Sequence, residues 1–331
     1  MCSSAKAVVL FSGGLDSILT VKLLQDQGIS TIALHCTTPF VGNPSDRFKD
    51  SLIKTYGIEE AIIKDLSLQF LPLLNHPKHG FGSQLNPCID CKILFLRTAK
   101  EIMEEKEASF IATGEVLGQR PFSQRREAME LIEREAGVES ILVRPLSAKL
   151  LKPTIPETKG LVKREELLDI QGRSRKRQLE LAKRYGLKEI PSPAGGCLLT
   201  DPSYSERLRR LLPFLNKLSP SDAIELLGIL RMGRLFMIDP EHLLIVARND
   251  SEAKGLKASQ RGTILTCNTS TGLMIGEPEP KSLNRAAKIL ARYTRGVEGP
   301  TQVKYEVNRT SEEILEVTPM PPEKVEEFLV R

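Results

Sequence analysis

The sequence lacks long hydrophobic runs, and its composition has no strong bias. None of its apolar runs approaches the ~20 residues that a membrane-spanning helix needs. Residues 1–6 are too few and too polar for a secretory leader, so we expect a cytoplasmic protein with no membrane partner. Hydrophobic residues make up 40% and charged residues 27% of the chain, which excludes a mostly disordered or fibrous protein. At 331 residues the chain is long for one hydrophobic core, and two domains are expected.

The chain has a small net charge and few cysteines. The 47 basic and 42 acidic residues leave a formal charge of +5, which does not by itself indicate a nucleic-acid partner. Six cysteines are too few in such a chain for a secreted disulfide framework, so metal binding or thiol chemistry is favoured wherever they cluster. Cys2, Cys36 and Cys267 lack suitable surroundings, and we expect them to be small buried or terminal residues.

The first motif is a glycine-rich turn between a strand and a helix. Residues 5–11 form an apolar run of strand length, the hexapeptide SGGLDS follows at 12–17, and helically spaced apolar residues continue to Gly28. Such a turn binds anions, because its glycines admit phosphate oxygens close to the backbone and the amides at the helix start point at them. Asp16 fits beside phosphates if it holds Mg²⁺ or handles a proton. The alternative is a tight turn that merely needs small residues.

The hexapeptide resembles the signature of the PP-loop ATP pyrophosphatases, which use ATP to adenylate a substrate and release pyrophosphate. The resemblance implies an α/β fold with a doubly wound parallel sheet, and the apolar segments 29–35 and 110–114 read as further strands of it. For His35 the alternative is an ordinary residue at the end of a strand. The residues implied in ATP binding are Ser12, Gly13, Gly14, Leu15, Asp16, Ser17, Leu34, His35, Thr113 and Gly114.

The second motif consists of three cysteines. Cys88 and Cys91 open a predicted helix, where the dipole and the free amides favour the thiolate of Cys91. Cys197 follows a turn-rich segment, PSPAGG, at 191–196. A Cys-x-x-Cys pair alone is ambiguous among zinc, redox and cluster roles, and no fourth zinc ligand stands at short spacing. Three thiolates that hold a [4Fe–4S] cluster with one open iron are chemically plausible.

The order of the hexapeptide and the cysteines is similar to that of the tRNA 2-thiouridylase family and related PP-loop tRNA sulfurtransferases. Those enzymes adenylate the carbonyl oxygen of a tRNA pyrimidine, and sulfur then displaces AMP. In members that use a persulfide, the positions matching Cys91 and Cys197 carry and resolve the sulfur. The additional Cys88 resembles the iron–sulfur-dependent branch of the family, in which the open iron of the cluster holds the sulfide.

This resemblance implies an ATP-dependent tRNA sulfurtransferase that acts on a pyrimidine, with uridine as the expected base. Asp16, Cys91 and Cys197 are its implied catalytic residues, and Cys88, Cys91 and Cys197 are the implied ligands of a [4Fe–4S] cluster. ATP and Mg²⁺ complete the set of cofactors. The implied partners are tRNA and a sulfur donor, which is sulfide, a cysteine desulfurase or a sulfur carrier, and a homodimer is one expected assembly.

Two basic segments are candidate RNA-binding surfaces. Residues 173–184 contain six basic residues and one acidic residue, and residues 281–309 contain seven and two. Lys and Arg neutralise phosphates regardless of base sequence, although each segment can also be an ordinary solvated helix face. The candidate contacts are Arg173, Arg175, Lys176, Arg177, Arg285, Lys288 and Arg292.

The pattern changes after about residue 202, and we place a domain boundary between residues 1–205 and 206–331. Predicted strands at 235–238, 243–247, 262–266 and 301–307 alternate with helices, which indicates a smaller α+β domain. The segment IVARND at 245–250 and a helix over 282–294 loosely resemble the NFACT-type RNA-binding domain. Two other functions stay open, namely a PP-loop amidase or ligase that acts on a small molecule, and a non-catalytic RNA-binding protein.

Overall fold

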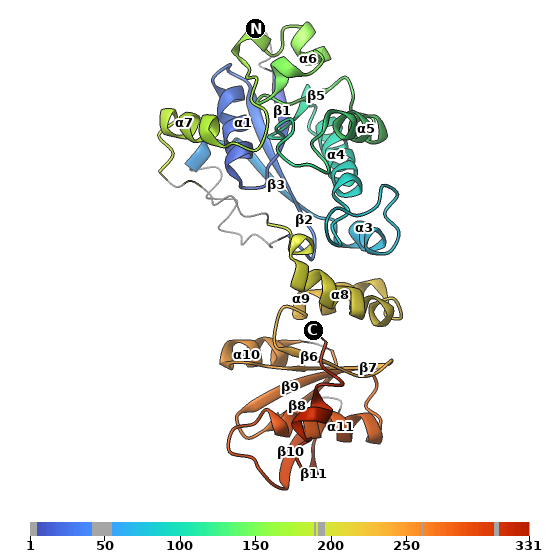
Figure 1. The fold of residues 1–331 in the computed structure, drawn as a ribbon. Helices are drawn as coiled ribbons and strands as arrows, with labels where there is room; N and C mark the ends of the chain where they lie inside the picture. Colours follow the sequence, from blue (N-terminus) through green and yellow to red (C-terminus); the bar gives the residue numbers. More distant parts are fainter. Residues whose placement is uncertain are drawn as a thin grey trace. The chain divides into compact units, whose positions relative to one another are not determined.

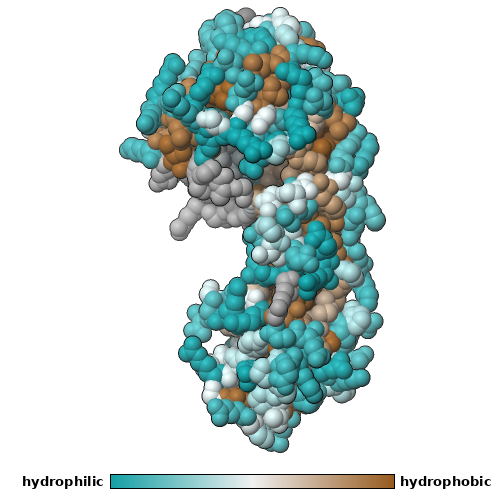
Figure 2. Space-filling model, in the orientation of Figure 1, coloured by the Kyte–Doolittle hydropathy of each residue, from teal (hydrophilic) through white to brown (hydrophobic). Residues whose placement is uncertain are grey.

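The fold is that of a computed structural model, which describes residues 5–41, 55–188, 190, 196–259, 261–307 and 311–330. Two compact units divide the chain, Met1–Pro202 and Ser203–Arg331, and Figure 1 colours them along the sequence. On the face drawn in Figure 2, hydrophilic side chains cover much of each unit. Within the described part of the chain, none of the helices is both long and apolar enough to cross a bilayer.

The N-terminal unit is built on a five-stranded sheet in the order β3-β2-β1-β4-β5. All four strand pairs are parallel. The chain first adds strands on one side of β1 and then on the other, so the order reverses between β1 and β4. Ligands of open α/β sheets bind at the carboxyl ends of the strands beside such a reversal. The strands are β1 (Lys6–Leu10), β2 (Ser30–Thr37), β3 (Glu60–Asp65), β4 (Phe110–Thr113) and β5 (Leu142–Val143).

Helices cover both faces of this sheet (Figure 1), which confirms the predicted doubly wound α/β fold. Successive residues of β1 point to opposite faces: Val9 packs in one core with Ile18 of α1, and Val8 packs in the other with Ile93 and Leu96 of α4. The helices are α1 (Leu15–Gln25), α3 (Ser67–Phe70), α4 (Cys88–Glu105), α5 (Arg126–Ala136), α6 (Ile155–Thr158) and α7 (Lys176–Arg184). Short 3₁₀ helices lie at Leu71–Leu74, Ala148–Leu150, Arg164–Glu166 and Leu198–Thr200.

The C-terminal unit is an antiparallel sheet in the order β11-β10-β8-β9-β7-β6, and the predicted α+β class is confirmed. Its main core lies between this sheet and α11, where Leu283 and Leu290 pack with Phe236 and Leu244. The strands are β6 (Arg234–Asp239), β7 (His242–Val246), β8 (Thr263–Cys267), β9 (Ser270–Ile275), β10 (Thr301–Val307) and β11 (Ser311–Val317). The helices are α8 (Pro202–Leu215), α9 (Pro220–Ile229), α10 (Asp250–Ala258), α11 (Pro280–Arg292) and α12 (Pro322–Val325).

Buried His242 connects the turn between β6 and β7 with the segment that follows β9. The ring of His242 is 3% exposed, with Nδ1 2.7 Å from Asp239 Oδ1 and Nε2 2.6 Å from the Glu277 carbonyl oxygen. Both ring nitrogens therefore face acceptors, and only the imidazolium donates to both. Burial lowers the pKa of His242, but the hydrogen bonds to Asp239 and Glu277 outweigh it and raise this pKa above its ordinary value.

We expect the C-terminal unit to lose stability as the pH rises through the raised pKa of His242. The stabilisation is complete below the unfolded-state pKa of about 6.5 and disappears at higher pH, because the neutral ring leaves one acceptor without a donor. Thermal unfolding of the wild type and of His242→Asn between pH 6 and 9 measures the effect. The pH dependence should be flatter in the variant, and a wild-type melting temperature that rises with pH relative to the variant would contradict the assignment.

Candidate functional site

The carboxyl end of β1 turns into α1 through two glycines. Gly13 has a φ of 78°, a left-handed conformation that glycine adopts without strain. Gly14 is the N-cap of α1 and has no side chain with which to cap the first amides of the helix. Ser12 is exposed, whereas Ser17 is buried and its hydroxyl donates to the Gly14 carbonyl oxygen at 2.8 Å. An uncapped helix start behind a left-handed glycine is a ready anion site, and we call residues 12–17 the phosphate loop.

Asp16 has one carboxylate oxygen with a partner and one without. Gln119 Nε2 donates to Asp16 Oδ2 at 3.1 Å, while Oδ1 is buried and has no hydrogen-bond partner among the described residues. Burial raises the pKa of Asp16 above its ordinary value, against the Gln119 hydrogen bond and the charges of Arg175 and Arg120. A buried carboxylate oxygen without a donor suits a hard cation such as Mg²⁺, so the residues present fit that ion.

The end of β4 lies directly against the phosphate loop. A Cβ atom on Gly114 would stand 2.6 Å from the carbonyl carbon and oxygen of Asp16 and 2.7 Å from the amide nitrogen of Ser17. Only glycine permits this approach. Thr113, the last residue of β4, is buried, and its hydroxyl donates to Glu115 Oε2 at 3.3 Å. Thr113 and Gly114 therefore lie at the same edge of the sheet as the phosphate loop.

The end of β2 is held in the core. Leu34 is completely buried and packs on the α4 face of the sheet, and its carbonyl oxygen accepts from Phe11 N at 2.8 Å. His35 is buried with Nδ1 2.7 Å from the Phe11 carbonyl oxygen. Burial lowers the pKa of His35, and the hydrogen bond to Phe11 opposes this. These two residues join β2 to the residue that precedes the phosphate loop.

Two distant segments bring the three cysteines into one neighbourhood. Cys88 and Cys91 occupy the first turn of α4, whose N-cap is Pro87. Cys197 forms an isolated antiparallel β-bridge with Val41, which lies beyond the end of β2. Beside it, Leu198 N donates to the Phe40 carbonyl oxygen at 3.1 Å. All three are partly buried free thiols, and those of Cys197 and Cys88 lie close enough to raise the pKa of Cys91. Residues 191–195, before Cys197, lie outside the described residues.

The prediction that the helix start favours the thiolate of Cys91 is wrong for this structure. Burial raises the pKa of Cys91 well above its ordinary value, Cys197 and Cys88 raise it further, and Lys92 opposes them only in part. Burial also raises the pKa of Cys197 to about 11. Desolvation of the charged form therefore outweighs the helix dipole. Cys36 and Cys267 are buried, as predicted, and Cys2 lies outside the described residues.

The cysteines are not arranged around a single metal ion. In the described ranges, no three His, Cys, Asp or Glu side chains are placed to share one ion. A [4Fe–4S] cluster makes a different demand, because each thiolate binds its own iron and the ligands stand farther apart. Three neighbouring, partly buried thiols fit that group. Binding of metal replaces the thiol protons, so the raised pKa values make it dependent on pH.

Lys92, Glu115 and Glu133 belong to a group of charges beside this site, and the sequence predictions give these three residues no role. Glu115 accepts hydrogen bonds from Lys92 and from Arg144, whose second carboxylate partner is Glu133. Burial raises the pKa of Glu115, but Lys92 and Arg144 outweigh it and hold this pKa at about 2. The only sequence signal is position, since Glu115 follows Gly114 and Lys92 follows Cys91.

The predicted RNA contacts lie on two separate helices, one in each unit. Arg173, Lys176 and Arg177 are exposed at or before the start of α7, and Arg177 pairs with Asp169 at 2.7 Å. Arg175 is partly buried and influences Asp16 electrostatically, so it lies near the phosphate loop. In the C-terminal unit, α11 carries Arg285, Lys288 and Arg292, the last of which is exposed.

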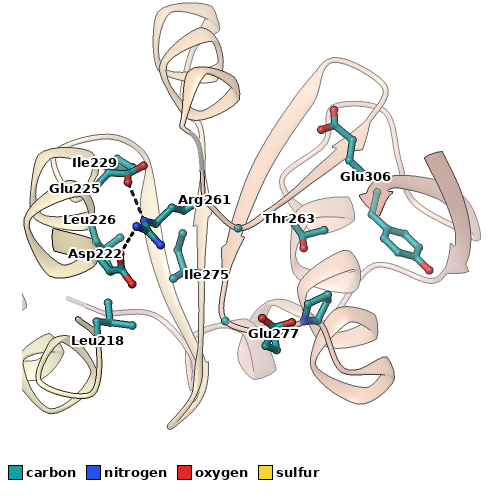
Figure 3. Close-up of a pocket in the computed structure, with 14 residues that line it drawn as sticks. Leu218, Asp222, Glu225, Leu226, Ile229, Arg261, Thr263, Ile275, Glu277 and Glu306 are labelled. Carbon is teal, nitrogen blue, oxygen red and sulfur yellow. Dashed lines mark hydrogen bonds and ion pairs between the residues drawn. The ribbon is translucent and has the colours of Figure 1, made fainter. Parts of the chain in front are cut away.

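The C-terminal unit contains a cavity of about 610 Å³ between α9 and the sheet (Figure 3). Its charged lining is mainly acidic. Among the described residues that line it, Arg261 is the one basic side chain, and it pairs with Asp222 and, at 3.0 Å, with Glu225. Glu277 and Glu306 complete the charged lining. An acidic wall repels phosphates, and none of the residues predicted to act on ATP, sulfur or RNA lines this cavity.

Comparison with known proteins identifies both parts of the chain. Residues 2–155 match the family described as thiamine biosynthesis protein (ThiI). Most of the N-terminal unit is thus similar to the ThiI family. Residues 233–329 match the NFACT protein RNA binding domain. The two matches confirm the resemblance to the PP-loop sulfurtransferase group and to the NFACT-type domain.

Two curated relatives of this chain are named as probable tRNA sulfurtransferases. A probable tRNA sulfurtransferase of Methanosarcina mazei is 31% identical over 126 residues, which are 35% of this chain and 29% of the relative. The probable tRNA sulfurtransferase of Methanobrevibacter smithii is 29% identical over 121 residues, 35% of this chain and 31% of the relative. The matched region thus spans less than a third of the length of these relatives.

Solved structures give weaker likenesses. A 4-thiouridine synthetase–RNA complex with bound ATP has a TM-score of 0.39 and 22% identity, over 66% of this chain and 53% of that one. The U34-tRNA thiolase NcsA from Methanococcus maripaludis, with its [4Fe-4S] cluster, has a TM-score of 0.35 and 19% identity, over 69% and 73%.

We expect Gly114→Ala to destabilise the N-terminal unit by about 1–3 kcal/mol, because the new methyl group meets the backbone of Asp16 and Ser17. Urea unfolding measures this loss. Gly228→Ala in α9 is the matched control, since no atom lies within 4 Å of its added Cβ. Equal unfolding free energies for wild type and Gly114→Ala would show that the loop moves aside without cost, contrary to this prediction.

Proposed function

We propose that the protein is an ATP-dependent tRNA sulfurtransferase. It adenylates a carbonyl oxygen of a tRNA pyrimidine, with uridine as the expected base, and replaces that oxygen with sulfur to give a thionucleoside. The contacts that carry this proposal link the phosphate loop to the cysteine helix. Gly114 lies against the backbone of Asp16 and Ser17. The next residue, Glu115, accepts a hydrogen bond from Lys92, which directly follows Cys91. The match to the ThiI family and the relatives named as tRNA sulfurtransferases support the same reaction.

ATP is required because the carbonyl oxygen of uracil is a poor leaving group, whereas AMP is a good one. When bound, ATP supplies that leaving group. The backbone around Gly13 and Gly14 and the first turn of α1 would hold its phosphates, and Asp16 would hold Mg²⁺ through the oxygen that has no partner. Arg120 and Arg175 bring positive charge to the same place, which stabilises the negative charge that develops on the phosphates.

The sulfur half of the reaction belongs to the cysteines. Cys88, Cys91 and Cys197 would hold a [4Fe–4S] cluster, which would supply an open iron for the sulfur atom to be transferred. Buried Asn86 donates from Nδ2 to Cys88 Sγ at 3.1 Å and so orients that thiol. The sulfur donor is sulfide, a cysteine desulfurase or a sulfur carrier. The homodimer stays a prediction from the resemblance.

The tRNA would be held through its phosphates. α11 buries Leu283, Ala287 and Leu290 in the core and carries Arg285, Lys288 and Arg292 along the same helix. The match of this unit to the NFACT protein RNA binding domain supports RNA as the ligand of that surface. An enzyme of this kind works in the cytoplasm, where tRNA is modified.

We expect the protein purified without oxygen to contain about four iron and four sulfide per chain, as a [4Fe–4S] cluster requires. Cys88→Ala should lose most of that iron and the visible absorption that goes with it. Cys267→Ala is the matched control, because Cys267 is a buried cysteine of the C-terminal unit. A wild-type protein that binds no iron even after reconstitution would exclude the cluster and leave the persulfide mechanism.

We expect tRNA from a strain without this gene to lack one thionucleoside, and the wild-type gene to restore it. Cys91→Ala and Asp16→Asn should not restore it, because the first removes a thiol and the second removes the charge that would hold Mg²⁺. Mass spectrometry of digested tRNA measures the nucleosides. An unchanged thionucleoside profile in the deletion strain would refute tRNA thiolation, and retained activity of Cys91→Ala on a small molecule would favour the amidase or ligase.

A further inference from the structure

Four charged side chains, one buried and three partly buried, connect α4 with the residue that follows Gly114. Lys92, Glu115, Glu133 and Arg144 form a chain of ion pairs with two positive and two negative members. Arg144 is 2% and Glu115 11% exposed, so the group is largely withdrawn from water. A buried group of ion pairs is weak grounds for stability, since desolvation offsets the attraction. Stability alone therefore does not explain why these ion pairs lie here.

Of the four, Glu115 is the one that is hydrogen-bonded both to Lys92 on α4 and to Thr113 at the end of β4. Its Oε2 atom accepts from Arg144 Nε at 2.9 Å and from the Thr113 hydroxyl at 3.3 Å. Its Oε1 atom accepts from Lys92 Nζ. A carboxylate with three donors, two of them charged, is held in one orientation.

The chain neighbours of these residues connect the two halves of the proposed reaction. Gly114, directly before Glu115, lies against the backbone of Asp16 and Ser17 in the phosphate loop. Lys92, directly after Cys91, is the fifth residue of α4, immediately beyond its first turn. A short path therefore runs from the phosphate loop to Cys91: a packing contact to Gly114, a peptide bond to Glu115, a hydrogen bond to Lys92 and a peptide bond to Cys91.

We propose that Glu115 is a positioning residue, which fixes the first turn of α4, with Cys88 and Cys91, in register with the phosphate loop. The inference rests on the proposed function for its chemistry, because sulfur has to reach the atom that ATP activates. Without the carboxylate, Lys92 keeps only the Ser123 carbonyl oxygen at 3.4 Å and turns toward water. The first turn of α4 then loses its tie to the end of β4.

Glu133 provides a matched control. Like Glu115, it is a partly buried carboxylate that pairs with Arg144, so Glu115→Gln and Glu133→Gln each remove one negative charge from the same guanidinium. Glu133 lies on α5 and has no hydrogen bond or ion pair to Lys92 or Thr113. An effect seen in both variants comes from the loss of a negative charge beside Arg144. An effect seen only in Glu115→Gln comes from the loss of the bonds that Glu115 makes to Lys92 and Thr113.

The first measurement is the rate at which iodoacetamide alkylates Cys91 in the full chain prepared without metal, read by mass spectrometry. We expect a rate at least roughly tenfold faster in Glu115→Gln, because a first turn released from β4 opens locally more often, and less than a threefold change in Glu133→Gln. Buried Cys36, in the core of the same unit, reports unfolding of the N-terminal unit in the same samples. An unchanged rate in Glu115→Gln, or an equal increase in both variants, would overturn the proposal.

The second measurement separates this proposal from the proposed function. In the tRNA thiolation assay, Glu115→Gln should lower kcat roughly 10- to 100-fold with a KM for ATP within threefold of wild type, because the phosphate loop itself is intact. A raised KM with unchanged kcat would overturn the positioning role. A wild-type protein that thiolates no tRNA would refute the proposed function, while the alkylation rates still decide whether Glu115 positions Cys91.

Discussion

The close approach of Gly114 to the phosphate loop is the constraint on which the site depends. β1 lies between β2 and β4, and all three strands end at one edge of a parallel sheet. Because the backbone at Gly114 packs against Asp16 and Ser17, the end of β4 and the start of α1 cannot move independently. This contact places the residues that follow Gly114: Glu115 accepts from Lys92 on α4, and Gln119 donates to Asp16. An anion-binding turn becomes part of a larger site through this one contact.

Burial sets the electrostatics of the site. It raises the pKa values of Asp16, Cys91 and Cys197, so these groups are costly to ionise until a cation or a metal arrives. Glu115 is the exception, because two cations hold its pKa at about 2 in equally buried surroundings. Asp16, Cys91 and Cys197 therefore become charged only when a ligand binds. Glu115 is already charged and paired with Lys92 and Arg144, so it can hold the surrounding elements in place without a ligand.

The C-terminal unit has a basic surface on α11 and an acidic cavity beside α9. α11 buries one stripe of apolar side chains in the core and carries basic residues elsewhere on the same helix, a division that follows from its 3.6-residue period. The cavity beside α9 has the opposite sign, with several carboxylates and one ion-paired arginine. Phosphates are attracted to the first surface and repelled from the second, which is why we propose α11 as the RNA-binding surface.

Local patterns in the sequence determined much of this protein. The hexapeptide predicted the turn between β1 and α1, apolar periodicity predicted β2, β4, α4 and α11, and alternation predicted β6, β7, β8 and β10. β9 and β11 were not predicted; β11 has charged residues that face solvent. Only the tertiary structure decided that Cys197 pairs with Val41, that Glu115 joins Lys92 to Arg144, and that burial outweighs the helix dipole at Cys91. Periodicity and turn chemistry act between near neighbours in the chain, whereas ion pairing and desolvation depend on residues that folding alone brings together.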